Sequence, residues 1–287
     1  MTEFKAGWFD AAIDHFIGAA LAEDIGPGDL TSLSTIAKGQ TGKALCYVKE
    51  DCTVAGVELA EMICARVDPS LKAVFTVKDG DRIQAVHCIG EITGSIHSIL
   101  QLERLMLNCM QRMSGIATKT RKLVDLVTPY GVKILDTRKT TPNFRVCEKW
   151  AVHIGGGVNH RFGLYDQMLI KDNHIEAAGG ISNAIESCIH YRNLSNSHVP
   201  LVVEVKTIDE FVIAKEFKAV DRILVDNFKP HQIHQLLLLN DTGKKIEASG
   251  GINASTIMEY AQTGIDFISM GDLTHHVESV DISLKIK

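Results

Sequence analysis

The sequence has no long hydrophobic run and no excess of positive charge. No apolar stretch approaches the ~18 residues that a membrane-spanning helix needs. Lysine and arginine together number 30, against 35 aspartates and glutamates, for a net charge of -5. A nucleic-acid-binding face needs cations clustered over a broad surface, and this balance argues against one. We therefore expect partners that are neither membranes nor nucleic acids, and any anion site must be a local concentration of cations.

The seven cysteines also lack a pattern, because they are scattered and contain no C-x-x-C pair. An odd, unpaired set of this kind indicates reduced thiols rather than a disulfide framework or a zinc site. The first sixteen residues contain three acids and no uninterrupted apolar segment, so no secretory signal is expected. Both observations predict a cytoplasmic protein.

What is present is enough apolar material for one large core or two smaller ones, 45% of 287 residues. Residues 10–21 and 57–67 have helical periodicity, and residues 43–49, 72–83 and 88–96 resemble strands, which predicts a small α+β domain. Residues 98–127 hold a long helical pattern, with a break expected at Ser114-Gly115. We interpret it as the bridge to a second domain.

Beyond this bridge the chain alternates strands and helices, which predicts right-handed βαβ units and a parallel sheet. No G-x-G-x-x-G motif follows the first strand, so a dinucleotide-binding sheet is not favoured. A complete or incomplete α/β barrel fits better, although a full barrel has eight strands. Six strands can be placed, at 132–136, 167–170, 201–205, 222–226, 245–249 and 266–270.

Each of these strands ends in residues able to bind an anion, a metal or a sugar. In parallel α/β folds the carboxyl ends of the strands build the functional site. Singly, such residues are as often ion pairs or helix caps, but six successive cases favour a site. The residues are Asp136, Arg138 and Lys139; Lys171 to His174; Glu204 and Lys206; Asp226 and Asn227; Ser249, Gly250 and Gly251; and Gly271 and Asp272.

The chemistry of these residues indicates two anionic ligands. The cations Arg138, Lys139, Arg161 and Lys171, with His160, can hold several phosphates or carboxylates. Acids among such cations commonly bind Mg²⁺ on substrate phosphates or accept hydrogen bonds from ribose, and Glu204 and Asp226 are candidates. The late glycine turns are typical of barrel phosphate loops, although each alone is a weak signal. We infer a phosphorylated sugar beside a second, acidic molecule.

The runs DTRKTTP, GGGVNHR and KDNH, followed by VVEV, ILVDNF and IEASGGIN, resemble the quinolinate phosphoribosyltransferase family, also called nicotinate-nucleotide pyrophosphorylase (carboxylating). The likeness extends from EDIGPGDLTS through ERLMLNCMQRMSGIAT to DISLKI, and so covers nearly the whole chain. One departure is Asn143, where the family commonly has glycine. Asparagine tolerates left-handed backbone better than most residues, so we expect the turn to persist.

The resemblance implies a two-domain α/β fold and a homodimer or larger oligomer. The first domain would be an α/β sandwich over residues 1–112, rejoined by residues 275–287. The second would be an open, incomplete barrel of seven strands over residues 113–274, one strand more than the pattern shows. The family also implies that each active site borrows Arg104 from its neighbour, although helical periodicity alone would make Arg104 a solvated position.

The activity that the resemblance implies is transfer of phosphoribose from phosphoribosyl pyrophosphate to quinolinate, with loss of CO2, in NAD biosynthesis. Mg²⁺ would be the cofactor, held by Glu204 and Asp226 largely through the substrate. Lys139, Lys171, Glu204 and Asp226 would be catalytic. The remaining substrate-binding positions that the resemblance implies are Arg104, Thr137, Arg138, His160, Arg161, Ser249, Gly250, Gly251, Met270, Gly271 and Asp272.

Three alternatives stay open at this point. A barrel lyase or isomerase acting on one sugar phosphate would explain the glycine turns but not the five candidate cations. A silent, ligand-binding relative would retain the fold without turnover. A phosphoribosyltransferase for nicotinate would leave part of the cation cluster unpaired, because nicotinate has one carboxylate fewer.

Overall fold

The computed structural model describes residues 9–287, so the first half of the segment that argues against a secretory signal lies outside the described residues. None of the helices in the described part is both long enough and apolar enough to cross a membrane. The chain forms two compact units. The first takes the chain up to Arg121 together with 140–156 and 273–287, and the second takes 122–139 and 157–272. The predicted boundary at 112/113 instead assigns residues 140–156 to the second domain.

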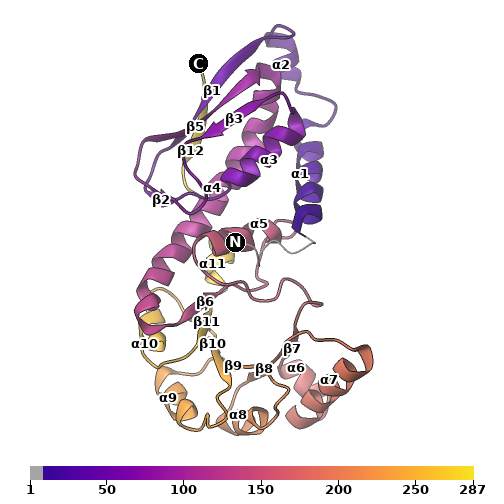
Figure 1. Ribbon diagram of the computed structural model, residues 1–287, viewed down its shortest axis with the longest axis vertical. Coiled ribbons are helices and arrows are strands. Elements are labelled where there is room, and N and C mark those ends of the chain that lie inside the picture. Colours follow the sequence, from indigo (N-terminus) through magenta and orange to yellow (C-terminus); the bar gives the residue numbers. More distant parts are fainter. Residues whose placement is uncertain (1–8) are drawn as a thin grey trace. The chain divides into compact units, whose positions relative to one another are not determined.

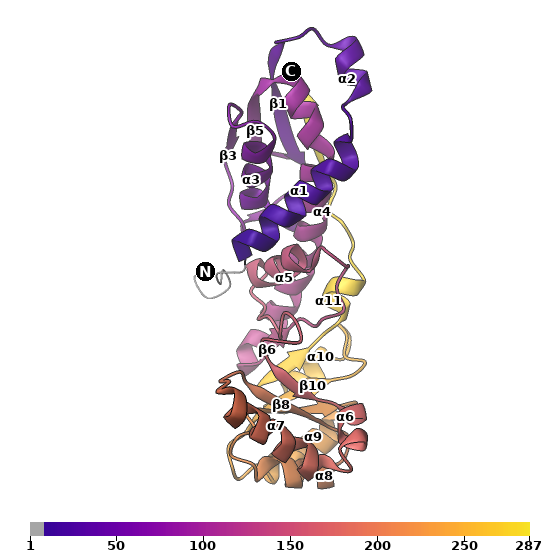
Figure 2. The same ribbon diagram turned by 90° about the vertical axis from the view of Figure 1, so that its right-hand side faces the viewer.

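The first unit is built on a four-stranded antiparallel sheet in the order β12-β1-β5-β3. Figures 1 and 2 show α3 lying along this sheet. The last strand, β12, pairs with β1, so residues near the end of the sequence complete the N-terminal sheet as expected. The elements of this unit are α1 (Phe9–Ile25), α2 (Leu30–Thr35), β1 (Thr41–Val48), β2 (Cys52–Thr53), α3 (Val57–Val67), β3 (Lys72–Phe75), β4 (Arg82–Ile83), β5 (His87–Ser95), α5 (Arg145–Ile154) and β12 (Ile282–Ile286).

Two details of the predicted first domain are wrong. Residues 72–83 form two strands, β3 and β4, because the chain turns between them at Gly80, which has a φ of 94°. The bridge helix α4 (Ile96–Val127) is continuous through Ser114-Gly115. A Cβ at Gly115 would collide with the Glu278 carbonyl, and the Ser114 hydroxyl is hydrogen-bonded to the Ala55 backbone. These small residues therefore allow a close approach of neighbouring segments rather than breaking the helix.

The second unit is an open, incomplete α/β barrel whose six strands are all parallel, in the order β6-β11-β10-β9-β8-β7. Figure 1 shows the helices of this unit arranged outside the strands. All six predicted strands are confirmed. The elements are η1 (Thr128–Tyr130), β6 (Lys133–Leu135), β7 (Met168–Ile170), α6 (Asp172–Ala177), α7 (Ile181–Ser195), β8 (Leu201–Val205), α8 (Ile208–Lys215), β9 (Arg222–Asp226), α9 (Pro230–Leu238), β10 (Lys245–Ser249), α10 (Ile257–Ala261) and β11 (Phe267–Ser269), with α11 (Asp272–His275) at the boundary along the chain.

The first strand of the barrel, β6, pairs with the last, β11, and the barrel is open between β6 and β7, which are the two ends of the strand order within residues 9–287. Strand β6 pairs with β11, and on its other side Leu135 forms a single parallel bridge with Val158. The family implies a seventh strand, and in the described residues this single bridge stands at the corresponding place in the chain. Residues 159–167 then lead from the bridge to β7, so Arg161 and His160 lie in the segment that follows the opening.

Candidate active site

The register of the parallel strands places several predicted site residues on one face of the sheet. Glu204 is opposite Leu224, Leu224 is opposite Glu247, and Asp226 is opposite Ser249. Paired residues of neighbouring strands share a face, and residues two apart along a strand share it too. Glu204, Asp226, Ser249 and Glu247 therefore belong to the same face. The residues that alternate with them are apolar and buried, and they include Val203, Val205, Ile223, Val225, Ile246 and Ala248.

The central contact on this face is an ion pair between Lys171 Nζ and Glu204 Oε2, at 2.8 Å. Glu204 is buried, whereas about half of the Lys171 side chain is exposed, 46%. Asp226 is half-buried and accepts a hydrogen bond from Asn227 Nδ2 on Oδ2, at 2.9 Å. Within residues 9–287, the second oxygen of each carboxylate accepts no hydrogen bond. Two acid oxygens on neighbouring strands are thus free to meet a hydroxyl or a cation.

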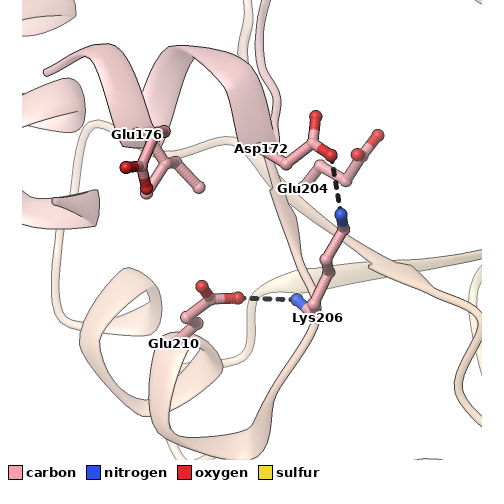
Figure 3. A pocket seen from close by; sticks show the side chains of 6 residues that line it. Asp172, Glu176, Glu204, Lys206 and Glu210 are labelled. Carbon is pink, nitrogen blue, oxygen red and sulfur yellow. Dashed lines mark hydrogen bonds and ion pairs between the residues drawn. The ribbon is translucent and has the colours of Figure 1, made fainter.

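A small pocket of about 160 Å³ lies beside this ion pair, and Figure 3 shows its acidic lining. The Lys206 ammonium lies 2.6 Å from Asp172 Oδ2, and the Lys206 backbone N–H donates to Glu210. The hydrogen bond with Asp172 raises the pKa of Lys206, and the same bond lowers the pKa of Asp172. Lys206 therefore forms its ion pair with Asp172, and Lys171 forms the ion pair with Glu204.

Two half-buried guanidinium groups, of Arg138 and Arg161, form the cationic part of the site. Burial, and then the nearby charge of Arg138, lower the pKa of Arg161. Arg138 Nε is buried and has no hydrogen-bond partner within residues 9–287. In the described part of the chain, Arg161 Nη1 donates one hydrogen bond, to the carbonyl of Gln167 at 3.3 Å. Like charges held together with an unsatisfied donor are costly unless an anion joins them, so this pair is suited to bind one.

Asp136, at the end of β6, organises the loop that carries Arg161. Its buried carboxylate accepts from Asn159 Nδ2 at 2.6 Å and from the His160 backbone N–H at 2.8 Å. Thr137 Oγ1 in turn accepts from the backbone N–H of Lys139, whose side chain is exposed. In the DTRK run, the side chains of Asp136 and Thr137 therefore hold the local backbone by hydrogen bonds, and the two cations follow them directly.

The glycine turn after β10, which the sequence predicts as a phosphate loop, has left-handed backbone at both glycines. Gly250 has a φ of 98°, and a Cβ there would collide with Asn227. Gly251 has a φ of 64° with open space beside it. At the second predicted loop, Met270 is buried and its N–H donates to the Leu135 carbonyl, while Gly271 and Asp272 are half-buried.

One predicted site residue does not join the others. Arg104 is exposed on α4 and belongs to the first unit, whereas every other predicted site residue belongs to the second. An exposed position agrees both with a solvated helix face and with a role in a neighbouring subunit. The predicted left-handed turn at Asn143 is confirmed, with a φ of 63°.

A buried ionic cluster within the barrel was not predicted from the sequence. Glu247 is fully buried in the middle of β10, and its Oε2 lies 2.9 Å from Arg222 Nε. Arg222 also lies over the Phe267 ring, 5.1 Å from its centroid, and contacts Gln167 Oε1 at 3.5 Å. The signal in the sequence is a glutamate inside an otherwise apolar strand, two residues before Ser249, whereas the predicted site residues lie at strand ends.

Comparison with known proteins identifies the family of the chain. Two family models match the chain: the N-terminal domain of quinolinate phosphoribosyl transferase over residues 29–114, and its C-terminal domain over residues 116–285. The chain is 44% identical to the chloroplastic nicotinate-nucleotide pyrophosphorylase [carboxylating] of Arabidopsis thaliana over 285 residues, covering 94% of this chain and 81% of that protein. It is 40% identical to the probable nicotinate-nucleotide pyrophosphorylase [carboxylating] of Bacillus subtilis, covering 96% and 92%.

Solved structures give the same result. The nicotinate-nucleotide pyrophosphorylase of Francisella tularensis superposes with a TM-score of 0.90 and 36% identity, and the match covers all of both chains. The models, the relatives and the fold thus agree over nearly the whole length. The chain belongs to the quinolinate phosphoribosyltransferase family.

Proposed function

We propose that this protein transfers the phosphoribosyl group of phosphoribosyl pyrophosphate to quinolinate. The products are nicotinate mononucleotide, pyrophosphate and CO2, and the reaction serves NAD biosynthesis. Family membership and the names of the curated relatives support this function.

The observation that carries the proposal is the buried Nε of Arg138, unsatisfied in the described part of the chain, with the charge of Arg138 near enough to lower the pKa of Arg161. Quinolinate bears two adjacent carboxylates on a pyridine ring, and two guanidinium groups match two carboxylates in charge and can each bind one of them. Arg138 Nε is a buried donor that lacks an acceptor within residues 9–287. A dicarboxylate would satisfy this donor and relieve the repulsion between the two cations. A sugar-phosphate lyase would have no use for the second guanidinium, and nicotinate would offer one carboxylate fewer.

The sugar belongs on the side of Glu204 and Asp226, whose free carboxylate oxygens can accept hydrogen bonds from ribose hydroxyls. These oxygens are also the donor type that Mg²⁺ prefers, so the residues fit this metal. Glu204 and Asp226 would hold Mg²⁺ largely through the substrate, where it supplies positive charge to the pyrophosphate. The glycine turn at Ser249, Gly250 and Gly251, with the loop at Met270 to Asp272, is proposed to hold the phosphates.

The chemistry follows from holding the two polyanions together. As the bond to pyrophosphate lengthens, ribose C1 gains positive charge, which Glu204 and Asp226 stabilise electrostatically. The pyridine nitrogen then forms the new bond to C1. The quaternised ring draws electrons from the adjacent carboxylate, so CO2 leaves and the ring carbon must take up a proton. Lys139 and Lys171 are the proposed sources of that proton.

We also propose a homodimer, or a larger oligomer, in which Arg104 contributes to the neighbouring active site. Its exposure on α4 and its place in the first unit support this role. A cytoplasmic location is proposed because all seven cysteines are free thiols.

The decisive experiment supplies phosphoribosyl pyrophosphate and Mg²⁺ with either quinolinate or nicotinate, and measures CO2 and the mononucleotide. We expect both products from quinolinate in equal amounts, and no CO2 from nicotinate. A parallel reaction with a chelator in place of Mg²⁺ should lose turnover. Failure to release CO2 from quinolinate would contradict the proposed function, and nucleotide formation from nicotinate alone would favour the alternative substrate.

A further inference from the structure

The cluster around Glu247 contacts His160, which directly precedes Arg161 of the site. His160 Nε2 lies 3.6 Å from Glu247 Oε1, while Glu247 Oε2 contacts Arg222 at 2.9 Å. Glu247 is fully buried, and burial raises its pKa whereas the Arg222 charge lowers it. Within residues 9–287 neither oxygen of this carboxylate has a hydrogen bond, so Glu247 acts on the guanidinium and the imidazole by electrostatic attraction across short distances.

The opposite nitrogen of the His160 ring is also engaged. His160 Nδ1 accepts a hydrogen bond from the backbone N–H of Arg161 at 2.7 Å. An accepting nitrogen carries no proton, so the ring proton is on Nε2, on the side that faces Glu247. A proton on Nδ1 would point at the backbone N–H of Arg161, and two donors facing each other repel. In this arrangement His160 is a neutral imidazole, and its side chain is only 7% exposed.

We propose that Glu247 is a positioning residue for quinolinate binding, acting through neutral His160 on the backbone of Arg161. Glu247 orients the imidazole, the imidazole holds the Arg161 N–H, and Arg161 thereby keeps its guanidinium beside Arg138. This assigns a role to a residue that the sequence analysis missed. It also changes the role of His160, which acts as a neutral link rather than as a further cation for the ligand. The proposal rests on the proposed function for its kinetic consequences.

A spectroscopic test is independent of turnover. Histidine labelled with ¹⁵N in the full-length protein would be observed by NMR, with the His160→Asn spectrum used to identify the His160 signals. We expect the ¹⁵N shifts of a neutral ring that is protonated on Nε2 and unprotonated on Nδ1. A ring protonated on Nδ1, or on both nitrogens, would overturn the proposal.

A kinetic test separates positioning from simple stabilisation. Replacing the buried pair by Glu247→Met with Arg222→Met removes both charges while keeping volume, and such swaps often preserve stability. We expect this folded double variant to raise the KM for quinolinate by about tenfold, because the imidazole loses the charge that orients it and one polar interaction with a charged group is worth about this much. The KM for phosphoribosyl pyrophosphate should change far less. Unchanged quinolinate KM in the folded variant would show that the cluster serves stability alone.

Variants of His160 give a third test. Asparagine can present an acceptor to the Arg161 N–H but can carry no charge. We therefore expect His160→Asn to retain more quinolinate affinity than His160→Ala. Equal losses would instead indicate that the ring acts as a cation on the ligand, contradicting the proposal. Absence of CO2 release by the unaltered protein would refute the proposed function, and the NMR result would still decide the state of His160.

Discussion

Lys171, directly after β7, and Glu204, in β8, form an ion pair in which the acid is buried and the base is half in solvent. The neighbouring pair of Lys206 and Asp172 has nearly the same length, but both of its partners are exposed. The two pairs offer a matched comparison, because exposed ion pairs contribute little to stability and a buried charge needs its partner.

We expect Lys171→Met to lower the free energy of unfolding by about 1–3 kcal/mol, because it leaves a buried carboxylate without its cation. It should also remove most turnover. Lys206→Met is the control and should unfold like the unaltered protein in urea. Equal stability of the two variants would show that Glu204 does not depend on Lys171.

Arg138→Ala should reduce kcat/KM for quinolinate by at least about a hundredfold, because it removes one partner of a buried charge contact. The circular dichroism spectrum should not change. Lys133→Ala alters an exposed cation at the opposite end of the same strand, and its effect should stay within about twofold. Unchanged quinolinate kinetics in a folded Arg138→Ala protein would remove Arg138 from the site.

Gly250→Ala should weaken binding of phosphoribosyl pyrophosphate and lower Tm, because the methyl group collides with Asn227 in a left-handed turn. Gly243→Ala is the control, since Gly243 has a φ of 67° and open space around its Cα. Both variants carry the backbone strain of about 1 kcal/mol. Only Gly250→Ala should raise the KM for phosphoribosyl pyrophosphate, as measured by initial rates.

Mixing two inactive variants tests the proposed shared active site. Arg104→Ala and Arg138→Ala proteins, unfolded and refolded together, would form mixed dimers with one intact site each. Random assembly should restore about a quarter of the sites, because half of the dimers are mixed. Each variant refolded alone is the control. If the mixture stays as inactive as its components, Arg104 does not act across an interface.

The thiols provide a prediction about reactivity. Burial raises the pKa of Cys46 and of Cys64 to about 12, so the reactive thiolate is scarce at pH 8. A thiol reagent should therefore react in the native protein mainly with Cys88 and Cys188, the two that are partly exposed. All seven thiols should react in denaturant. Rapid reaction of most thiols in the native state would contradict this burial.

The six barrel strands could be predicted because strands buried on both faces are short apolar runs that end at polar residues. The same reasoning located Glu204 and Asp226, since strand direction brings the carboxyl ends together. The pairing of Lys171 with Glu204 rather than with Asp172 could not be predicted, because it depends on side-chain direction across two strands.

Other features depend on contacts between distant residues. Residues 140–156 join the first unit, where Trp150 meets Phe9 edge to face at 5.0 Å, and no local pattern reports such a contact. Glu247 likewise occupies a strand interior that periodicity assigns to apolar residues, and only the position of Arg222 makes its burial understandable.

The return of β12 to the N-terminal sheet has a consequence for biosynthesis. Strand β1 pairs with β5 on one side and with β12 on the other, and β12 is made some 230 residues later. During translation the first unit must therefore wait with an open edge until the barrel has been synthesised. Exposed edges of this kind recruit foreign strands, so the nascent chain is most vulnerable to aggregation in that interval.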